Sequence, residues 1–223
     1  MNSKNQNKDN AIECNSQLFT DTNLQKVQFD IEEAIKEIKN TFEKATNIIG
    51  MINIVALPSS EDFKDADTYK TINLIWNYAH PTNSKDHLNE QAEYFDFEVQ
   101  DTYKIIELLR ALNLFTYDKY NDSIELLERA CIVSLARLKI DKFGLLESED
   151  LAILSNKDIS EIEKLIDQNI IKKYDKLDLG RDHVIANEAL LYLKSINIEP
   201  FSSYDYDEYM IDMENMIQSY YSA

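Results

Sequence analysis

Glycine is the residue that most constrains this chain, because 223 residues contain only Gly50, Gly144 and Gly180. These positions are too far apart for a phosphate-binding loop, which needs several glycines within about eight residues. Proline is equally scarce, with three in the chain, so the many turns of a β-sandwich or barrel would lack their usual residues. About 44% of the residues are hydrophobic, which is enough for the core of one or two domains. We therefore expect a mainly α-helical protein.

Residues 27–52 carry a regular apolar stripe. The spacing alternates between four and three over Ile31, Ile35, Ile38, Phe42, Ala45, Ile49 and Ile52. This period predicts one long amphipathic helix. Two interpretations remain open: a homodimer through residues 27–52, and a helix that faces the core of its own bundle. The positions beside the stripe, such as Ala34 and Thr41, lack the charges that usually set coiled-coil pairing.

The middle of the chain predicts further helices. The expected elements are a helix over 67–79 with Ile72, Ile75 and Trp76 inward, a helical region in two pieces over 88–115, a turn over 117–121 and a helix over 124–140. Asp122 and Glu125 predict a capping box at the start of the last helix. That helix is apolar on nearly every side, which is typical of a central, buried helix.

The net charge of −18 bears on the partners that this chain could bind. A general nucleic-acid-binding protein has the opposite sign, because Lys and Arg meeting phosphates supply most of its affinity. The excess of acidic residues indicates a soluble protein that repels other polyanions. It also fits attraction to a basic protein partner.

The cysteines and the apolar segments bear on location. We expect Cys14 and Cys131 to be free thiols, which suits a reducing compartment. The first ten residues lack the apolar centre of a secretory signal. The longest apolar stretch, residues 48–57, is too short to span a bilayer. A cytoplasmic protein without a membrane anchor is therefore expected.

Motifs for catalysis and metal binding are missing from the sequence. The histidines are His80, His87 and His183, and none lies in an H-E-x-x-H pattern. We expect His80 and His87 to be exposed loop residues. Acidic residues surround Gly180, but their spacing fails the calcium-loop pattern of the EF-hand. The sequence therefore predicts no enzymatic activity, no metal and no cofactor.

A different pattern follows Gly144. Leu151 and Ala152 lie in a predicted short helix, and Asn156 follows where the chain must turn, since Asn tolerates the left-handed conformation. Asp158 and Glu161 predict a capping box for a second helix. The expected inward side of this second helix consists of Ile159, Ile162, Leu165 and Ile166.

The remainder of this region predicts a strand, a turn, a strand and a closing helix. The first strand contains Ile170 and Ile171, the turn lies around Gly180, and the second strand contains Val184 and Ile185. The closing helix carries Ala189, Leu190, Tyr192 and Leu193. We expect Leu151, Ala152, Ile162, Leu165, Leu190 and Leu193 to be buried together.

Residues 145–195 resemble the winged helix-turn-helix domains of the excisionase/MerR type. The resemblance rests on D-L-A-I-L-S-N at 150–156 and V-I-A-N-E-A-L-L-Y-L-K at 184–194. It implies a second helix that enters the DNA major groove and a wing that contacts the DNA backbone. The chain departs from the pattern at Lys157, where an apolar turn residue is usual.

The expected architecture is mainly α: an N-terminal helical bundle, a small winged helix-turn-helix domain and an acidic C-terminal helix. The expected divisions are a flexible leader over 1–23, a helical domain over 24–142, a winged helix-turn-helix-like domain over 145–197 and an acidic, tyrosine-rich tail over 198–223.

Two functions follow from this pattern. A DNA-associated regulatory protein would bind nucleic acid through Ser160, Lys164, Lys172, Lys173, Lys176 and Arg181. Alternatively, an acidic protein-interaction module would keep the winged fold without binding DNA, and act as a DNA mimic or inhibitor. Its partner-binding residues would be Glu161, Glu163, Asp167, Asp205, Asp207 and Glu208. Acidic residues outnumber basic ones by 11 to 7 over residues 145–197, which opposes phosphate binding.

Overall fold

The computed structural model describes residues 15–49, 67–80, 95–142, 144–174 and 183–198. The elements in chain order are α1 (Asn15–Leu18), α2 (Asp21–Ile49), α4 (Asp67–Ala79), α5 (Phe95–Thr116), α6 (Asn121–Asp141), β1 (Leu145–Glu147), α7 (Ser148–Ser155), α8 (Ile159–Asp167), β2 (His183–Ile185) and α9 (Ala186–Ser195). The described protein is mainly helical, as predicted. The predicted acidic C-terminal helix lies outside the described residues.

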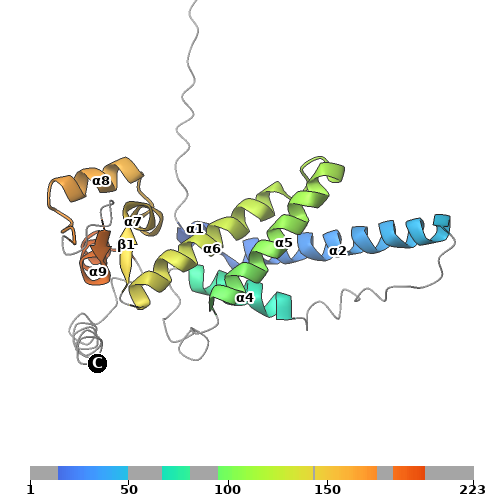
Figure 1. Ribbon diagram of the computed structural model, residues 1–223, viewed down its shortest axis with the longest axis horizontal. Coiled ribbons are helices and arrows are strands. Elements are labelled where there is room, and N and C mark those ends of the chain that lie inside the picture. The colour runs from blue at the N-terminus through green and yellow to red at the C-terminus, as the bar shows by residue number, and fades with distance from the viewer. Residues whose placement is uncertain (1–14, 50–66, 81–94, 143, 175–182, 199–223) are drawn as a thin grey trace, which may run out of the picture.

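Helix α6 is the central element of the molecule. It contacts α2, α4 and α5 along one part of its length and α7, β1 and α9 along another. It therefore runs from the helical bundle, formed by α1 to α6, to the C-terminal unit, formed by the elements from β1 to α9 (Figure 1). The prediction of a central, buried helix is therefore confirmed. The predicted capping box is wrong: Tyr120 occupies the cap position, without a side-chain hydrogen bond, and Asp122 pairs with Lys26 instead.

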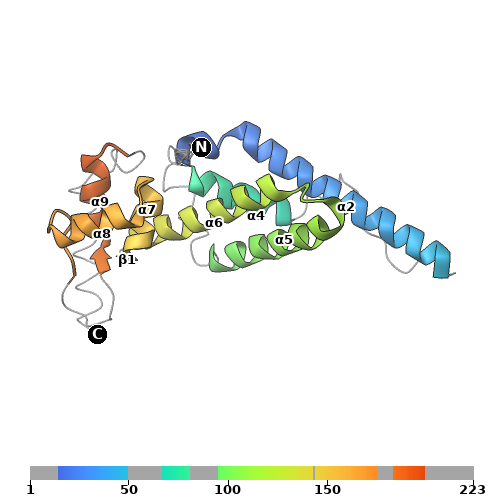
Figure 2. The same ribbon diagram turned by 90° about the horizontal axis from the view of Figure 1, so that it is seen from above.

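Helix α2 uses the first part of its apolar stripe inside its own bundle. Val27 and Ile31 are buried in the common core, Ile35 packs against it, and Ala34, beside the stripe, is buried as well. Further along, α2 extends beyond the other helices of the bundle, as two perpendicular views show (Figures 1 and 2). The homodimer through residues 27–52 stays a prediction, and residues 50–52 lie outside the described part of the chain.

Two predictions near the bundle differ from the structure. Residues 15–23 belong to the predicted flexible leader, but they form α1 and the start of α2. Phe19 packs edge-on against Trp76, with 5.4 Å between the ring centroids, and this apolar contact orders the segment. His80 is partly buried rather than exposed, and its carbonyl accepts a hydrogen bond from the buried Arg137. Burial lowers the pKa of His80. His87 lies outside the described residues.

Helices α7 and α8 are joined by a tight turn. Asn156 has φ 55° and ψ 43°, the left-handed conformation predicted for it, and the amide of Lys157 donates to the carbonyl of Ala152. The N-terminus of α7 has a capping box between Glu147 and Asp150. Asp158 does occupy the cap position of α8, but no side-chain cap bond forms.

The small sheet contains one of the two predicted strands, β2, but pairs it with an unpredicted partner. Strand β1, which precedes α7, is antiparallel to β2, with Leu146 opposite Val184. Both of these side chains are buried, and their contact holds the two ends of the C-terminal unit together. The predicted strand at Ile170-Ile171 is not assigned, although Tyr174 donates a backbone hydrogen bond to His183 at 2.8 Å.

The core of the C-terminal unit is close to the predicted one. Leu151, Ala152, Ile162, Leu190 and Leu193 are buried in the common core. Leu165 is only partly buried and packs at the edge of that core. Ile159 is 44% exposed, so its predicted inward position is wrong. It begins α8, and we infer that this first turn extends beyond the side chains that cover Ile162 and Ile166.

Candidate functional site

Helix α8 presents a continuous polar surface to solvent. We define its outer face as Ser160, Glu161, Glu163, Lys164, Asp167 and Gln168, all of which are exposed. Ile162 and Ile166 anchor the opposite side of the helix in the core. Residues in the left-handed conformation, Asn156 and Asn169, mark the turns near its two ends. The helix lies at the outer edge of the C-terminal unit (Figure 1).

The outer face of α8 is acidic. This face carries three acidic residues, Glu161, Glu163 and Asp167, and one basic residue, Lys164. The nearby Lys157 bonds to Glu161, with 2.9 Å between Nζ and Oε1. That hydrogen bond raises the pKa of Lys157. A phosphate approaching this surface would therefore meet mostly carboxylates.

The segment that follows α8 supplies the described part of the predicted wing. Lys172 and Lys173 are exposed, and the neighbouring Ile171 is buried as an anchor. The ammonium group of Lys172 lies 3.7 Å from a carboxylate oxygen of Glu188 in α9. Of the predicted site residues, Lys176, Arg181, Asp205, Asp207 and Glu208 lie outside the described residues.

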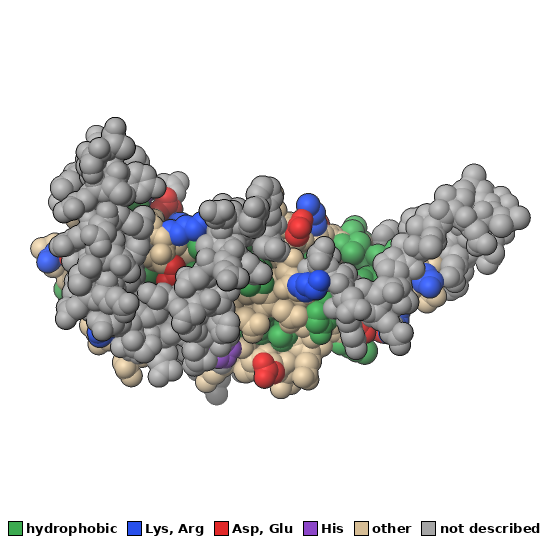
Figure 3. Space-filling view, turned by 90° about the horizontal axis from the view of Figure 1, so that it is seen from below, with side chains coloured by type: hydrophobic (Ala, Val, Ile, Leu, Met, Phe, Trp, Pro, Cys, Tyr) green, Lys and Arg blue, Asp and Glu red, His purple; other side chains and the backbone are tan. Residues whose placement is uncertain are grey.

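Basic side chains do not gather on the face drawn in Figure 3. Among the described residues there, Lys and Arg side chains lie separately, several of them close to acidic ones. A protein that tracks a duplex through its phosphates concentrates Lys and Arg on one surface. The described part of this face lacks that arrangement.

The described residues give little evidence for a metal site or a reactive cysteine. Within the described ranges, no group of three or more His, Cys, Asp or Glu side chains could hold a metal ion. Cys131 is a free, buried thiol, and burial raises its pKa to about 12. A thiol with that pKa stays protonated near neutral pH and is a poor nucleophile. Cys14 lies outside the described residues.

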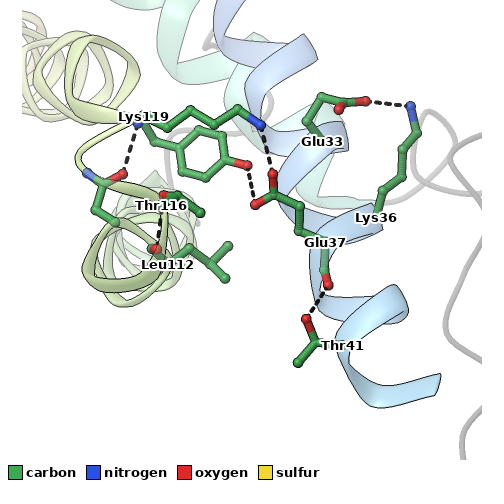
Figure 4. Close-up of polar contacts among 9 residues, drawn as sticks. Glu33, Lys36, Glu37, Thr41, Leu112, Thr116 and Lys119 are labelled. Atoms are coloured by element: carbon green, nitrogen blue, oxygen red, sulfur yellow. Dashed lines mark hydrogen bonds and ion pairs between the residues drawn. The ribbon is translucent and has the colours of Figure 1, made fainter. Parts of the chain in front are cut away.

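A polar cluster that the sequence did not reveal joins α2 to the turn before α6. The carboxylate of Glu37 accepts hydrogen bonds from Lys119 at 2.8 Å and from the Tyr120 hydroxyl at 2.9 Å. Figure 4 shows Lys119 reaching toward Glu37, one turn before Thr41 on the same helix. These bonds lower the pKa of Glu37. The cluster ties α2 to the bundle near the point where the helix extends away from it.

The sequence also did not reveal a groove beside α1 and α6. It has a volume of about 420 Å³ and is lined by Leu18, Asn23, Lys26, Asp122, Glu125, Leu126 and Arg129. Its residues come from two segments about 100 positions apart in the chain, so no local pattern could have found it. The one local signal is the i,i+4 pair of Glu125 and Arg129 on α6.

Comparisons with known proteins do not narrow the function. In the described part of the chain, no helix has both the length and the apolar character needed to cross a membrane. No protein-family model, curated protein or solved structure matches this chain. Its function is therefore inferred from its own surfaces.

Proposed function

We propose that this chain is an acidic protein-interaction module that keeps a winged helix-turn-helix-like arrangement and binds a basic partner segment through the outer face of α8. The observation that carries the proposal is that the outer face of α8 exposes three carboxylates and a single basic residue, Lys164. The chain as a whole has a net charge of −18, which attracts a basic partner over a longer range.

The buried side of α8 supports this role. Ile162 and Ile166 fix the helix in the core, so its outer carboxylates are presented on a rigid element rather than on a loop. Beside them, Ile159 is 44% exposed and Ile170 is 62% exposed. A partner segment that covers these two side chains would remove their apolar surface from water and so add to the affinity.

A DNA-associated regulator is the second candidate. The order of helix, turn, helix and closing strand with helix resembles the expected winged domain, and Lys172 and Lys173 are exposed in the described part of the wing. Against this candidate, the outer face of α8 offers only Lys164 to phosphates. Carboxylates that face phosphates reduce affinity.

One titration separates the two candidates. The full chain is titrated with a fluorescently labelled peptide rich in Lys and Arg, and separately with labelled duplex DNA, from low to moderate salt. We expect the peptide to bind, with an affinity that falls as salt rises, and the duplex not to bind at the lowest salt. Duplex binding that weakens when Lys172 and Lys173 are both changed to Ala would instead favour the regulator.

Variants of α8 locate the peptide surface. Replacing Glu161, Glu163 and Asp167 together by Gln, Gln and Asn should weaken peptide binding about tenfold, since each lost charge pair at an exposed site is worth up to about 1 kcal/mol. The matched control removes three exposed acids elsewhere: Asp101→Asn, Glu107→Gln and Asp118→Asn. Equal weakening by both triple variants would mean that only the net charge matters, and would contradict a site on α8.

A further inference from the structure

The groove beside α1 and α6 contains two opposite charges that do not pair with each other. Glu125 and Arg129 are one helical turn apart on α6, a spacing at which a glutamate and an arginine ordinarily form an ion pair. No such pair forms between them. Both side chains nevertheless line the same groove.

Arg129 is held by neutral oxygens only. Its Nε and Nη2 donate to the side-chain oxygen of Asn15 at 3.3 and 3.1 Å, and Nη2 also lies 3.5 Å from the carbonyl oxygen of Ile153 in α7. Among the described residues, no carboxylate pairs with this guanidinium and nothing accepts a hydrogen bond from Nη1. Burial without a nearby acid lowers the pKa of Arg129.

The other lining residues complete the chemistry of the groove. Glu125 is exposed and has no ion-pair or hydrogen-bond partner in the described part of the chain. Lys26 is already neutralised by Asp122, with 2.5 Å between their charged atoms. Leu18 and Leu126 supply apolar surface. The volume of about 420 Å³ lies in the range of small-molecule sites.

We propose that this groove binds a small zwitterion of the amino-acid class with an aliphatic side chain. The Nη1 group of Arg129 donates to the ligand carboxylate, Glu125 accepts from the ligand ammonium group, and Leu18 and Leu126 contact the aliphatic side chain. The charged lining residues are two cations, Lys26 and Arg129, and two acids, Asp122 and Glu125, so the groove has no excess positive charge to attract a polyanion such as a nucleotide. This site is independent of the proposed interaction surface on α8.

Binding is tested with L-leucine as the probe. The ligand is titrated into the full, isotope-labelled chain, and NMR follows the Arg129 Nε–H and the side-chain amides of Asn15 and Asn23. We expect saturable shifts. Two analogues test the two charges: leucinamide lacks the carboxylate and 4-methylpentanoate lacks the ammonium group. Each should bind about tenfold more weakly, since each loses one hydrogen-bonded charge.

The decisive variant is Glu125→Gln, because Glu125 is exposed and its loss disturbs no described contact. This variant should reduce the affinity for L-leucine about tenfold, and it should not weaken the binding of 4-methylpentanoate, which has no ammonium group to donate to Glu125. Glu107→Gln, on α5, is the matched control and should change neither. Urea unfolding checks that the two variants are equally stable.

Three outcomes would overturn the proposal. They are the absence of saturable shifts up to millimolar L-leucine, equal binding of leucinamide and L-leucine, and an unchanged L-leucine affinity in Glu125→Gln. Arg129→Gln is a supporting variant only, since Arg129 also connects α1, α6 and α7.

Discussion

Two arginines two turns apart on α6 mark regions with different roles. Arg137 is 2% exposed. Its Nη1 donates to the carbonyls of Tyr78 and His80 at 2.9 and 3.2 Å, its Nε lies 3.7 Å from Asp141, and its guanidinium carbon lies 4.7 Å from the centre of the Tyr78 ring. Arg129 is partly buried, and its hydrogen-bond acceptors in the described residues are neutral oxygens.

The difference lies in how the buried charge is compensated. Around Arg137, protein carbonyls, a carboxylate and an aromatic ring replace the water that the charge has lost, and the Tyr78 hydroxyl bonds to Asp141 as well. This region therefore holds α4 against α6. Around Arg129 the replacement is partial, and the remaining donors are directed to a groove or to solvent. A buried charge that is compensated by a carboxylate, two carbonyls and an aromatic ring fits a structural role, whereas a charge next to neutral oxygens leaves an anionic group to be supplied from outside, as proposed above.

Replacing each arginine by Met should give the largest difference in the free energy of unfolding between the two regions. Arg137→Met should reduce the free energy of unfolding by about 3–5 kcal/mol, because it leaves a buried carboxylate and buried carbonyls without their partner. Arg129→Met should cost about 1–1.5 kcal/mol, the value of ordinary neutral-acceptor hydrogen bonds. Urea unfolding followed by circular dichroism measures both. Equal losses would show that the two charges are compensated alike.

The same contrast between complete and partial burial applies to α8. Ile162 is fully buried and Leu165 is partly buried. Ile162→Ala should therefore cost about 2–4 kcal/mol, since it leaves a cavity that the core cannot fill. Leu165→Ala should cost about 1–2 kcal/mol because less apolar surface returns to water. A larger loss for Leu165→Ala in chemical unfolding would contradict the burial seen in the structure.

The smallest expected effect concerns the partly exposed cluster at Glu37. Its folded pKa is lowered by the bonds from Lys119 and Tyr120. The resulting stabilisation is present above the ordinary carboxyl pKa, and it is lost as pH falls through the lowered pKa. The side chain is 35% exposed, so solvent screening keeps the contribution below about 1 kcal/mol. Unfolding measured between neutral and acidic pH should show this loss, and Glu37→Gln should remove it.

The helices and most of the core were predictable because their signal is local. The apolar period of α2 and α4 indicates which side of each helix faces inward, and Ile72, Ile75 and Trp76 are buried as predicted. The outer face of α8 was also predictable from spacing alone. The exception, Ile159, follows the period but lies in the first turn of the helix, where the period cannot show how far the covering elements reach.

The sheet and the groove were not predictable for a different reason. Strand β1 has three residues and one inward side chain, Leu146, which is too short to show an alternating pattern. Its partner β2 begins 36 positions after β1 ends. One partner of Arg129, Asn15, is still further away, at a separation of 114 positions.

The sequence by itself determined that this chain is mainly helical, where most of its described helices run, that α6 is central and that α8 carries acidic side chains outward. These properties depend on residue types at a fixed helical spacing, and each helix displays them locally. The tertiary structure alone decided which short strands pair, that Arg137 is enclosed while Arg129 is not, and that Glu125 and Arg129 share a groove without pairing. Those features depend on contacts between distant segments, and only the folded chain brings such segments together.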